Sequence, residues 1–286
     1  MLKNIEVFYF PETVKDAVRL LNRHAPHAAV IAGGTLITKS PNLSTRVLVD
    51  IRGIDMDYVK VQAGRLRIGA RTSFQSLADS KLLQKWAGGA LSRAAAAVTT
   101  HLIRNAGTIG GDVARALPYN DMPPVLMALD AEAVIVDGKK TRTLPVEEMV
   151  RGHMWRIVGR RALLTEFRLP SETRKRACAI ARFARSASDW EAMVHAVASM
   201  EKSRGICRNA RIVLGAVTRH AQRFPQAEAV LEGKPYSESL AAEAAQAVFD
   251  GLTPVSRASA EYRREVASVL VRRAIREVWN ENETQQ

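Results

Sequence analysis

The sequence predicts an α+β fold in two domains, and three observations lead to this prediction. The chain has 286 residues, enough to bury a sizeable core, and this length favours two domains. Segments with helical apolar spacing alternate along the chain with short segments of strand character. A polar, basic link from Pro170 to Arg176 then separates two parts of different pattern. We expect a first domain over residues 1–172 and a smaller α+β domain over residues 173–286.

The first elements predict a small β-α-β-β unit. Residues 12–24 carry apolar side chains at helical spacing, and Thr13 is a start signal for that helix. A buried strand is expected over residues 28–34, broken by the glycine pair at its end, and a second strand over residues 46–51. The glycine pair would therefore lie in a loop at the end of a strand.

Two hairpins and several helices are expected next. A hairpin over residues 58–70 would turn at Ala63-Gly64, and another over residues 131–145 would turn at Asp137-Gly138. The remaining elements expected in this domain are helices over 73–86 and 88–98, loop and turn over 101–112, a helix over 122–129 and a strand over 161–170.

The second domain has a different pattern. It opens with a strand and a turn, followed by a segment that is either helix-like or extended, and then by a strand over residues 210–217. Amphipathic helices are expected over residues 239–252 and 259–281. An apolar stripe is expected on one side of the last helix, at Val266, Val269, Leu270, Arg273, Ala274 and Val278.

Composition excludes several classes of protein. With 47% hydrophobic and 25% charged residues the chain is typical of a globular protein. It contains no run of eighteen apolar residues, so no membrane span is predicted. The N-terminal residues lack the pattern of a secretory signal, so we expect a cytoplasmic protein. Cys178 and Cys207 have no metal-ligand spacing. Because an iron–sulfur cluster needs about four thiolates, this chain alone is not expected to hold one, nor any other metal.

The net charge of +13 is concentrated in one segment. Residues 151–185 contain ten Lys and Arg against two Asp and Glu, whereas residues 186–286 are balanced. This excess could form a face that docks onto an acidic partner, or simply a solvated basic surface. Nucleic acid is not expected as a partner, because no nucleic-acid-binding motif accompanies the charge.

Two glycine-rich loops are the main candidates for a ligand site. "AGGT" ends at Thr35, and "TIGG" begins at Thr108. Glycine allows the backbone to approach a ligand closely, and successive N–H groups in such a loop can bind an anion such as a diphosphate. Asp121 could accept a hydrogen bond from a ribose hydroxyl. The alternative, that both glycine pairs are simple tight turns, stays open at this point because neither loop has a Rossmann or Walker spacing.

These segments resemble a known family. "AGGT" after an N-terminal β-α unit, together with "IRNAGTIGGDVARALPYNDMPPVLMALDAEAVI", is similar to the FAD-binding medium subunits of molybdenum hydroxylases. That family includes the xanthine dehydrogenase and aerobic carbon monoxide dehydrogenase types. The opening "FYFPETVKDAVRLL" and the later "RFARSASDW" also resemble the family, so the similarity covers essentially the whole chain.

The resemblance implies a fold, a cofactor and a set of binding residues. The fold is the two-lobed FAD-binding fold of the vanillyl-alcohol oxidase (PCMH) type, with lobe one over about 1–54 and lobe two over about 55–172, followed by a C-terminal domain like that of the carbon monoxide dehydrogenase flavoprotein. The cofactor is FAD. The cofactor-binding residues implied by the family are Val30, Ile31, Ala32, Gly33, Gly34, Thr35, Leu36, Ile37, Val98, Thr108, Gly111, Asp112, Asp121 and Trp190.

The chain departs from the family pattern at two positions in these loops. Asp112 stands where the family usually has asparagine, and Leu36 where it usually has a polar residue. A negative charge at Asp112 is expected to weaken the binding of a diphosphate by electrostatic repulsion. An alternative function is therefore a scaffold subunit of the same fold that binds FAD weakly or has lost it.

The resemblance also implies partners. A large subunit with a molybdenum cofactor would oxidise the substrate, and a small subunit would carry electrons through two [2Fe–2S] clusters to FAD in this chain. NAD or oxygen would be the acceptor. Because the flavin carries the redox chemistry, no residue of this chain is expected to act as a catalytic acid or base.

Overall fold

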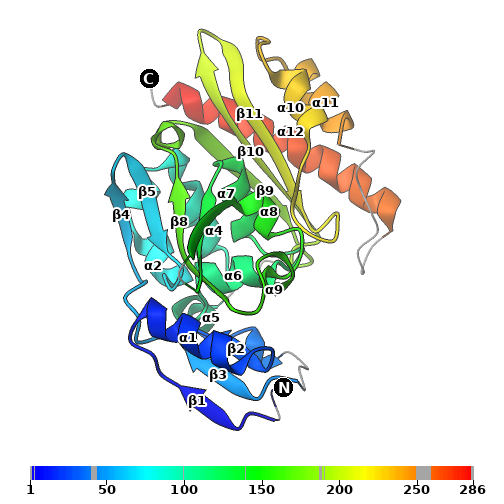
Figure 1. Ribbon diagram of the computed structural model, residues 1–286. Helices are drawn as coiled ribbons and strands as arrows, with labels where there is room; N and C mark the ends of the chain where they lie inside the picture. Colours follow the sequence, from blue (N-terminus) through cyan, green and yellow to red (C-terminus); the bar gives the residue numbers. More distant parts are fainter. Residues whose placement is uncertain are drawn as a thin grey trace.

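Three β-sheets organise the part of the chain that the structure describes. The computed structural model describes residues 2, 4–39, 44–98, 100–138, 140–186, 189, 191–248 and 259–284. In Figure 1 a three-stranded sheet lies at the N-terminal end and a five-stranded sheet lies in the middle. A four-stranded sheet, covered by helices, forms the C-terminal end.

The N-terminal lobe is the expected β-α-β-β unit. Its elements are β1 (Val7–Tyr9), α1 (Val14–His24), β2 (Ala28–Ile31) and β3 (Val47–Asp50). The strands are parallel in the order β1-β3-β2. The hydroxyl of Thr13 caps α1 by accepting a hydrogen bond from the backbone N–H of Asp16. The buried face of α1 packs on this sheet and reaches Leu163 in the next lobe.

The middle sheet is antiparallel and contains both predicted hairpins. Its order is β4-β5-β8-β6-β7, so β8, the last of these strands along the chain, lies at the centre of the sheet and pairs with β5 and β6. The strands are β4 (Val59–Gln62), β5 (Arg65–Gly69), β6 (Glu132–Asp137), β7 (Lys140–Pro145) and β8 (Ala162–Leu169). The accompanying helices are α2 (Phe74–Asp79), α3 (Lys81–Gln84), α4 (Ala90–Ala96), α5 (His101–Ala106), α6 (Ile109–Arg115), α7 (Met122–Ala128), α8 (Val146–Met149) and α9 (Met154–Ile157).

The expectation of loop and turn over residues 101–112 is wrong, because this stretch forms α5 and most of α6. Thr100 and Thr108 are N-cap residues, and each hydroxyl accepts a hydrogen bond from a backbone N–H three residues later. The glycine pair lies in the first turn of α6. Glycine lowers helix propensity, but the caps and the packing of this turn outweigh that cost.

The C-terminal domain is an antiparallel sheet covered by helices. The order is β12-β11-β10-β9, and α12 packs on β10 and β9 with α11 beside it. The elements are β9 (Ala177–Phe183), β10 (Val194–Ser203), β11 (Ile206–Gly215), β12 (Gln222–Arg223), α10 (Pro225–Leu231), α11 (Glu238–Gln246) and α12 (Ala260–Thr284). Val269, expected in the apolar stripe of α12, is 56% exposed and does not belong to it. No helix in the described ranges is long and apolar enough to span a membrane.

Helix α7 joins the middle and C-terminal sheets. All of its residues are buried, and it packs against β10 and β11. The same apolar core includes Val197 and Val213 of the C-terminal sheet. A helix that is apolar on every side must be covered on every side, so α7 ties the two sheets together.

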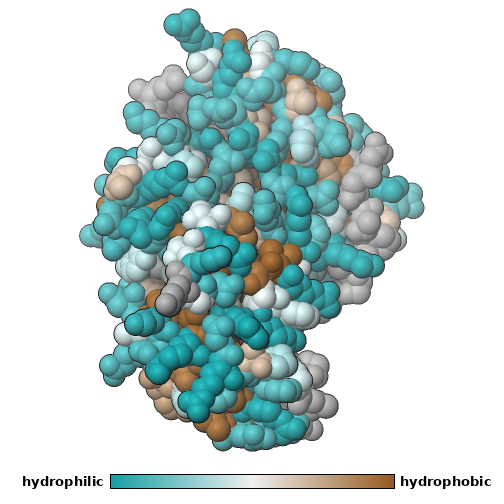
Figure 2. All heavy atoms as spheres, in the orientation of Figure 1, coloured by the Kyte–Doolittle hydropathy of each residue, from teal (hydrophilic) through white to brown (hydrophobic). Residues whose placement is uncertain are grey.

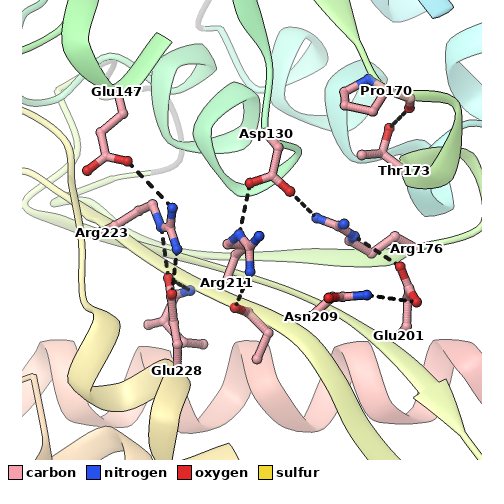
Figure 3. A network of polar contacts seen from close by, with 12 residues as sticks. Asp130, Glu147, Pro170, Thr173, Arg176, Glu201, Asn209, Arg211, Arg223 and Glu228 are labelled. Carbon is pink, nitrogen blue, oxygen red and sulfur yellow. Dashed lines mark hydrogen bonds and ion pairs between the residues drawn. The ribbon is translucent and has the colours of Figure 1, made fainter. Parts of the chain in front are cut away.

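A polar network flanks this apolar contact (Figure 3). Asp130 follows α7 and accepts hydrogen bonds from Arg176 at 2.7 Å and from Arg211 at 2.8 Å. Arg176 also lies 3.7 Å from Glu201. The link after Pro170 is therefore anchored between the two sheets. The domain bounds at 172/173 stay a prediction.

Part of the excess positive charge of residues 151–185 is neutralised within the chain. Four of its basic side chains form ion pairs: Arg168 with Glu166, Arg176 with Asp130, Arg182 with Asp121, and Arg185 with Asp189. Arg176 is only 6% exposed. Buried Arg176 cannot contribute to a docking face, and the interpretation of the rest of the segment as a docking face stays a prediction. In Figure 2 the visible surface is mostly hydrophilic, with apolar areas near the junction of the N-terminal lobe and the middle of the molecule.

Candidate functional site

Two adjoining cavities lie where the N-terminal lobe meets the middle domain. The larger, of about 300 Å³, is bounded by the loop after β2, by α6, by β8 and by the segment around α9. The smaller, of about 200 Å³, extends toward Val98 and Asp121. The two cavities have four lining residues in common, namely Thr35, Leu36, Phe74 and Asp112. Together they form an elongated site.

The loop after β2 offers unused hydrogen-bond donors to the larger cavity. Gly34 has a φ of +73°, a conformation that glycine adopts without strain. Its carbonyl accepts hydrogen bonds from the hydroxyl and the N–H of Thr38, which hold the loop in place. Within the described part of the chain, the N–H groups of Gly33, Gly34 and Thr35 donate no hydrogen bond. A loop with several free N–H groups is suited to bind an anion.

Gly33 and Gly110 are required for packing. A Cβ atom on Gly33 would lie 1.5 Å from the carbonyl oxygen of Ala106, and one on Gly110 would lie 2.5 Å from the carbonyl oxygen of Ala70. Both contacts are with backbone, so no side-chain rotation could relieve them. At these two positions glycine permits a close approach between parts of the chain itself.

The N-terminal turn of α6 does not form the expected anion-binding nest. The N–H groups of residues 109–112 all donate within the chain, to the carbonyl oxygens of Thr72, Ala70 and Thr108 and to the Thr108 hydroxyl. The expectation of an anion-binding nest at this glycine pair is therefore wrong. Gly111 lines the larger cavity, and a Cβ atom there would meet only the Thr108 Oγ1 atom, at 3.1 Å.

Asp112 is a buried carboxyl group at the junction of the two cavities. It is 9% exposed, and its Oδ2 atom has no hydrogen-bond partner in the part of the chain that is described. Burial, and secondly the nearby carboxylate of Asp121, raise the pKa of Asp112 well above its usual value, against a hydrogen bond from the backbone of Met122. This environment disfavours the negative charge expected at this position.

Asp121 connects the smaller cavity to the C-terminal domain. Its Oδ1 atom lies 3.1 Å from Nδ1 of His195 on β10 and 3.3 Å from Nε of Arg182 on β9. His195 is fully buried. The sequence places Asp121 in the expected site but does not indicate its pairing with His195, which lies 74 positions away along the chain.

The segment around α9 supplies residues that are not among the cofactor-binding residues expected from the sequence. His153, Trp155 and Arg160 line the larger cavity, as does Arg115 of α6. The guanidinium groups of Arg160 and Arg156 lie 4.4 and 5.1 Å from the centroid of the Trp155 ring. Trp155 is 42% exposed, so it is not the core residue that its type suggests. The sequence signal for these residues was a tryptophan with several arginines close to it along the chain.

The structure brings most of the expected site residues together. The larger cavity is lined by Val30, Ala32, Gly33, Gly34, Thr35, Leu36, Ile37, Thr108, Gly111 and Asp112. The smaller is lined by Val98 and Asp121 as well. Ile31 does not line either cavity, and Trp190 lies outside the described residues. Whether each lining residue contacts a cofactor stays a prediction.

Comparison with family models gives two matches that follow one another along the chain. Residues 3–172 match the FAD binding domain in molybdopterin dehydrogenase. Residues 179–278 match the carbon monoxide dehydrogenase flavoprotein C-terminal domain. The predicted two-lobed FAD-binding fold with a further C-terminal domain is confirmed by these matches.

Individual relatives agree with the family matches. The chain is 28% identical to the carbon monoxide dehydrogenase medium chain of Hydrogenophaga pseudoflava, over 95% of this chain and 96% of the relative. It is 31% identical to subunit alpha of the 6-hydroxypseudooxynicotine dehydrogenase complex of Paenarthrobacter nicotinovorans, covering 92% and 91%. A solved structure of the Hydrogenophaga pseudoflava carbon monoxide dehydrogenase superposes with a TM-score of 0.91 at 28% identity, covering 98% of this chain and 99% of that chain.

Proposed function

Because the chain belongs to the family of FAD-binding subunits of molybdopterin dehydrogenases, we propose that it is the electron-transfer flavoprotein subunit of such a complex. FAD is its cofactor, and the protein is a subunit of an oxidoreductase. When bound, FAD would accept electrons from [2Fe–2S] clusters of a partner subunit and deliver them to an external acceptor such as NAD or oxygen. The elongated pair of cavities is the observation that carries this proposal.

The residues around the cavities suit the parts of FAD. The free N–H groups of Gly33, Gly34 and Thr35 would hold the diphosphate, and Arg115 and Arg160 add positive charge to the lining of the same cavity. An extended dinucleotide needs an extended site, which the two joined cavities supply. The task of this chain is to bind and orient the flavin and to exclude water from it.

The proposed partners are a large subunit with a molybdenum cofactor and a small subunit with [2Fe–2S] clusters. Cys178 and Cys207, both buried and unpaired, are too few to hold such a cluster. The clusters must therefore come from another chain if electrons reach the flavin by this route. Two unpaired thiols also suit the reducing cytoplasm, where we place the complex.

The alternative function is a scaffold subunit without FAD, and the structure weakens one of its two supports. It rested on a negative charge at Asp112 and on the apolar Leu36. The raised pKa of Asp112 weakens the first support, because an uncharged acid does not repel a diphosphate. Leu36 lines both cavities, where an apolar side chain can pack against the cofactor. Absence of flavin from the purified chain and from its complex would favour the scaffold.

Replacing Gly111 with valine tests the site directly. The new side chain would enter the larger cavity without meeting other backbone, so it should block the cofactor and leave the fold intact. We expect FAD affinity to fall at least about tenfold, or roughly 1.4 kcal/mol. Flavin absorption of the purified protein and titration of the apoprotein with FAD provide the measurement.

The matched control is Gly53→Val. A Cβ atom on Gly53 would meet only the carbonyl oxygen of Pro11, at 3.5 Å, and Gly53 lines neither cavity. This variant should keep its flavin, and both variants should melt near the wild-type temperature. Undiminished flavin content in a folded Gly111→Val protein would place FAD elsewhere. Purification of the complex with iron–sulfur and molybdenum in fixed ratio to FAD tests the proposed partners.

A further inference from the structure

The protonation state of the Asp112 carboxyl group bears on how tightly the cofactor binds. We propose that this chain binds FAD tightly only while Asp112 is an uncharged carboxylic acid, so that a proton on Asp112 forms part of the cofactor site. The inference rests on the proposed FAD site and adds a condition to it. Deprotonation and cofactor binding would then oppose each other.

The position of Asp112 is the first argument. The residue borders both cavities at the place where they join, so a ligand that extends through both must pass beside it. Its Oδ2 atom is buried without a donor in the described residues. A buried carboxylate oxygen without a donor is costly, whereas the protonated oxygen of a neutral acid carries no charge to stabilise.

The neighbouring charges are the second argument. The ionisable groups that border the two cavities with Asp112 are Lys39, Arg115, Tyr119, Asp121, His153 and Arg160. Asp121, directed to Arg182 and His195, is the carboxylate that acts on Asp112. On the other elements packed against α6, Glu147 of α8 lies near Arg223 and Glu166 of β8 binds Arg67 and Arg168.

The cofactor would strengthen the preference for the neutral acid. A diphosphate brings additional negative charge close to Asp112, and like charges disfavour the ionised form. FAD should therefore raise the pKa of Asp112 above its value in the apoprotein, which burial already raises. By linkage, FAD affinity is constant below the apoprotein pKa and falls by up to about tenfold per pH unit between the two pKa values.

Two measurements on the full chain test this inference. FAD affinity is determined by titration of the apoprotein across neutral and alkaline pH. Difference infrared spectroscopy follows the carbonyl band of a protonated carboxyl group over the same range, with and without FAD. The variants are Asp112→Asn, which has no proton to lose, and Asp16→Asn as a control on the exposed side of α1.

We expect a protonated carboxyl band at neutral pH that is absent from Asp112→Asn, and a band midpoint that moves to higher pH when FAD binds. Affinity should fall at alkaline pH in the wild type and in Asp16→Asn but stay level in Asp112→Asn. In the infrared measurement, the inference is overturned if the band is missing, if FAD does not move its midpoint, or if the band never titrates while the protein is folded. In the affinity titration, it is overturned if Asp112→Asn shows the same loss of affinity at alkaline pH as the wild type. A wild type that binds no FAD at any pH contradicts the proposed function instead.

Discussion

Replacing Gly33 with alanine should remove FAD from the protein and loosen the N-terminal lobe from α5. The added Cβ atom would lie 1.5 Å from the carbonyl oxygen of Ala106 and 3.2 Å from the N atom of Gly107. Normal contact between such atoms needs roughly 3.5 Å, so the loop would have to move by about 2 Å. That shift displaces the free N–H groups of residues 33–35, and a site misplaced by more than about 0.5 Å loses its function.

We expect the flavin content of Gly33→Ala to fall at least about tenfold, and the free energy of unfolding to fall by about 2–3 kcal/mol because of overpacking. Flavin absorption and denaturant titration give the two values. Gly152→Ala is the control, because its Cβ atom would meet only Cδ1 of Ile157 at 3.9 Å. Full flavin content in Gly33→Ala would show that this close contact does not position the loop.

The contrast between Gly33 and Gly111 shows what sequence could and could not predict about the site. The motif indicates that both residues lie near a ligand, and both line the larger cavity. It does not indicate that a side chain on Gly33 would strike backbone while one on Gly111 would enter the cavity. That difference depends on how α5 and α6 pack against the loop after β2, which is a tertiary contact.

Local signals predicted the elements whose structure depends on local chemistry. Both expected hairpins form, because turn geometry depends on the residues in the turn itself. The first turns at Ala63-Gly64 as expected, whereas in the second Asp137 still pairs with Lys140, so the turn begins one residue later than the expected Asp137-Gly138. Helix α6 was missed because its glycine pair lowers helix propensity, and the contact of Gly110 with Ala70 that compensates for it cannot be read from the sequence.

Burial changed the expected properties of several other residues. Strand β10 could not be distinguished from a helix because residues 194–200 are all buried, between α12 on one face and α7 on the other, so no polar alternation appears. Asp112 and Arg176 were treated as exposed charges. Asp112 is instead buried, and Arg176 is a buried member of an ion pair. Sequence gives the type of a charged residue, whereas its solvent exposure depends on the fold.

The substitution Asp130→Asn should cause the largest loss of stability among conservative changes to the polar network of Figure 3. The carboxylate of Asp130 holds Arg176, which is 6% exposed, and Arg211, which is 24% exposed. Asparagine keeps the size of the side chain and tolerates the positive φ of 50° at this position. The change therefore removes the charge and leaves Arg176 buried without its main partner.

Breaking a buried ion pair by removing one partner costs about 3–5 kcal/mol, and the 29% exposure of Asp130 reduces the expected cost to roughly 2–4 kcal/mol. Denaturant titration at neutral pH gives the value. Glu132→Gln is the matched control, because it breaks a more exposed pair with Arg65 and should cost less than about 1 kcal/mol. Equal losses in the two variants would mean that burial of Arg176 adds nothing to the strength of its ion pair.

The same variant should also differ from the wild type in its response to acid. Burial acts to raise the pKa of Asp130, but the hydrogen bonds and charges of Arg211 and Arg176 outweigh it and hold the pKa below its usual value. A lowered pKa stabilises the fold at pH values above the unfolded pKa of about 3.9, and this contribution is lost as pH falls through the folded pKa. The stability difference between wild type and Asp130→Asn should therefore be constant from about pH 7 to pH 5 and shrink below about pH 4. A difference that instead shrinks between pH 7 and pH 5 would show that another group, and not Asp130, titrates in this network.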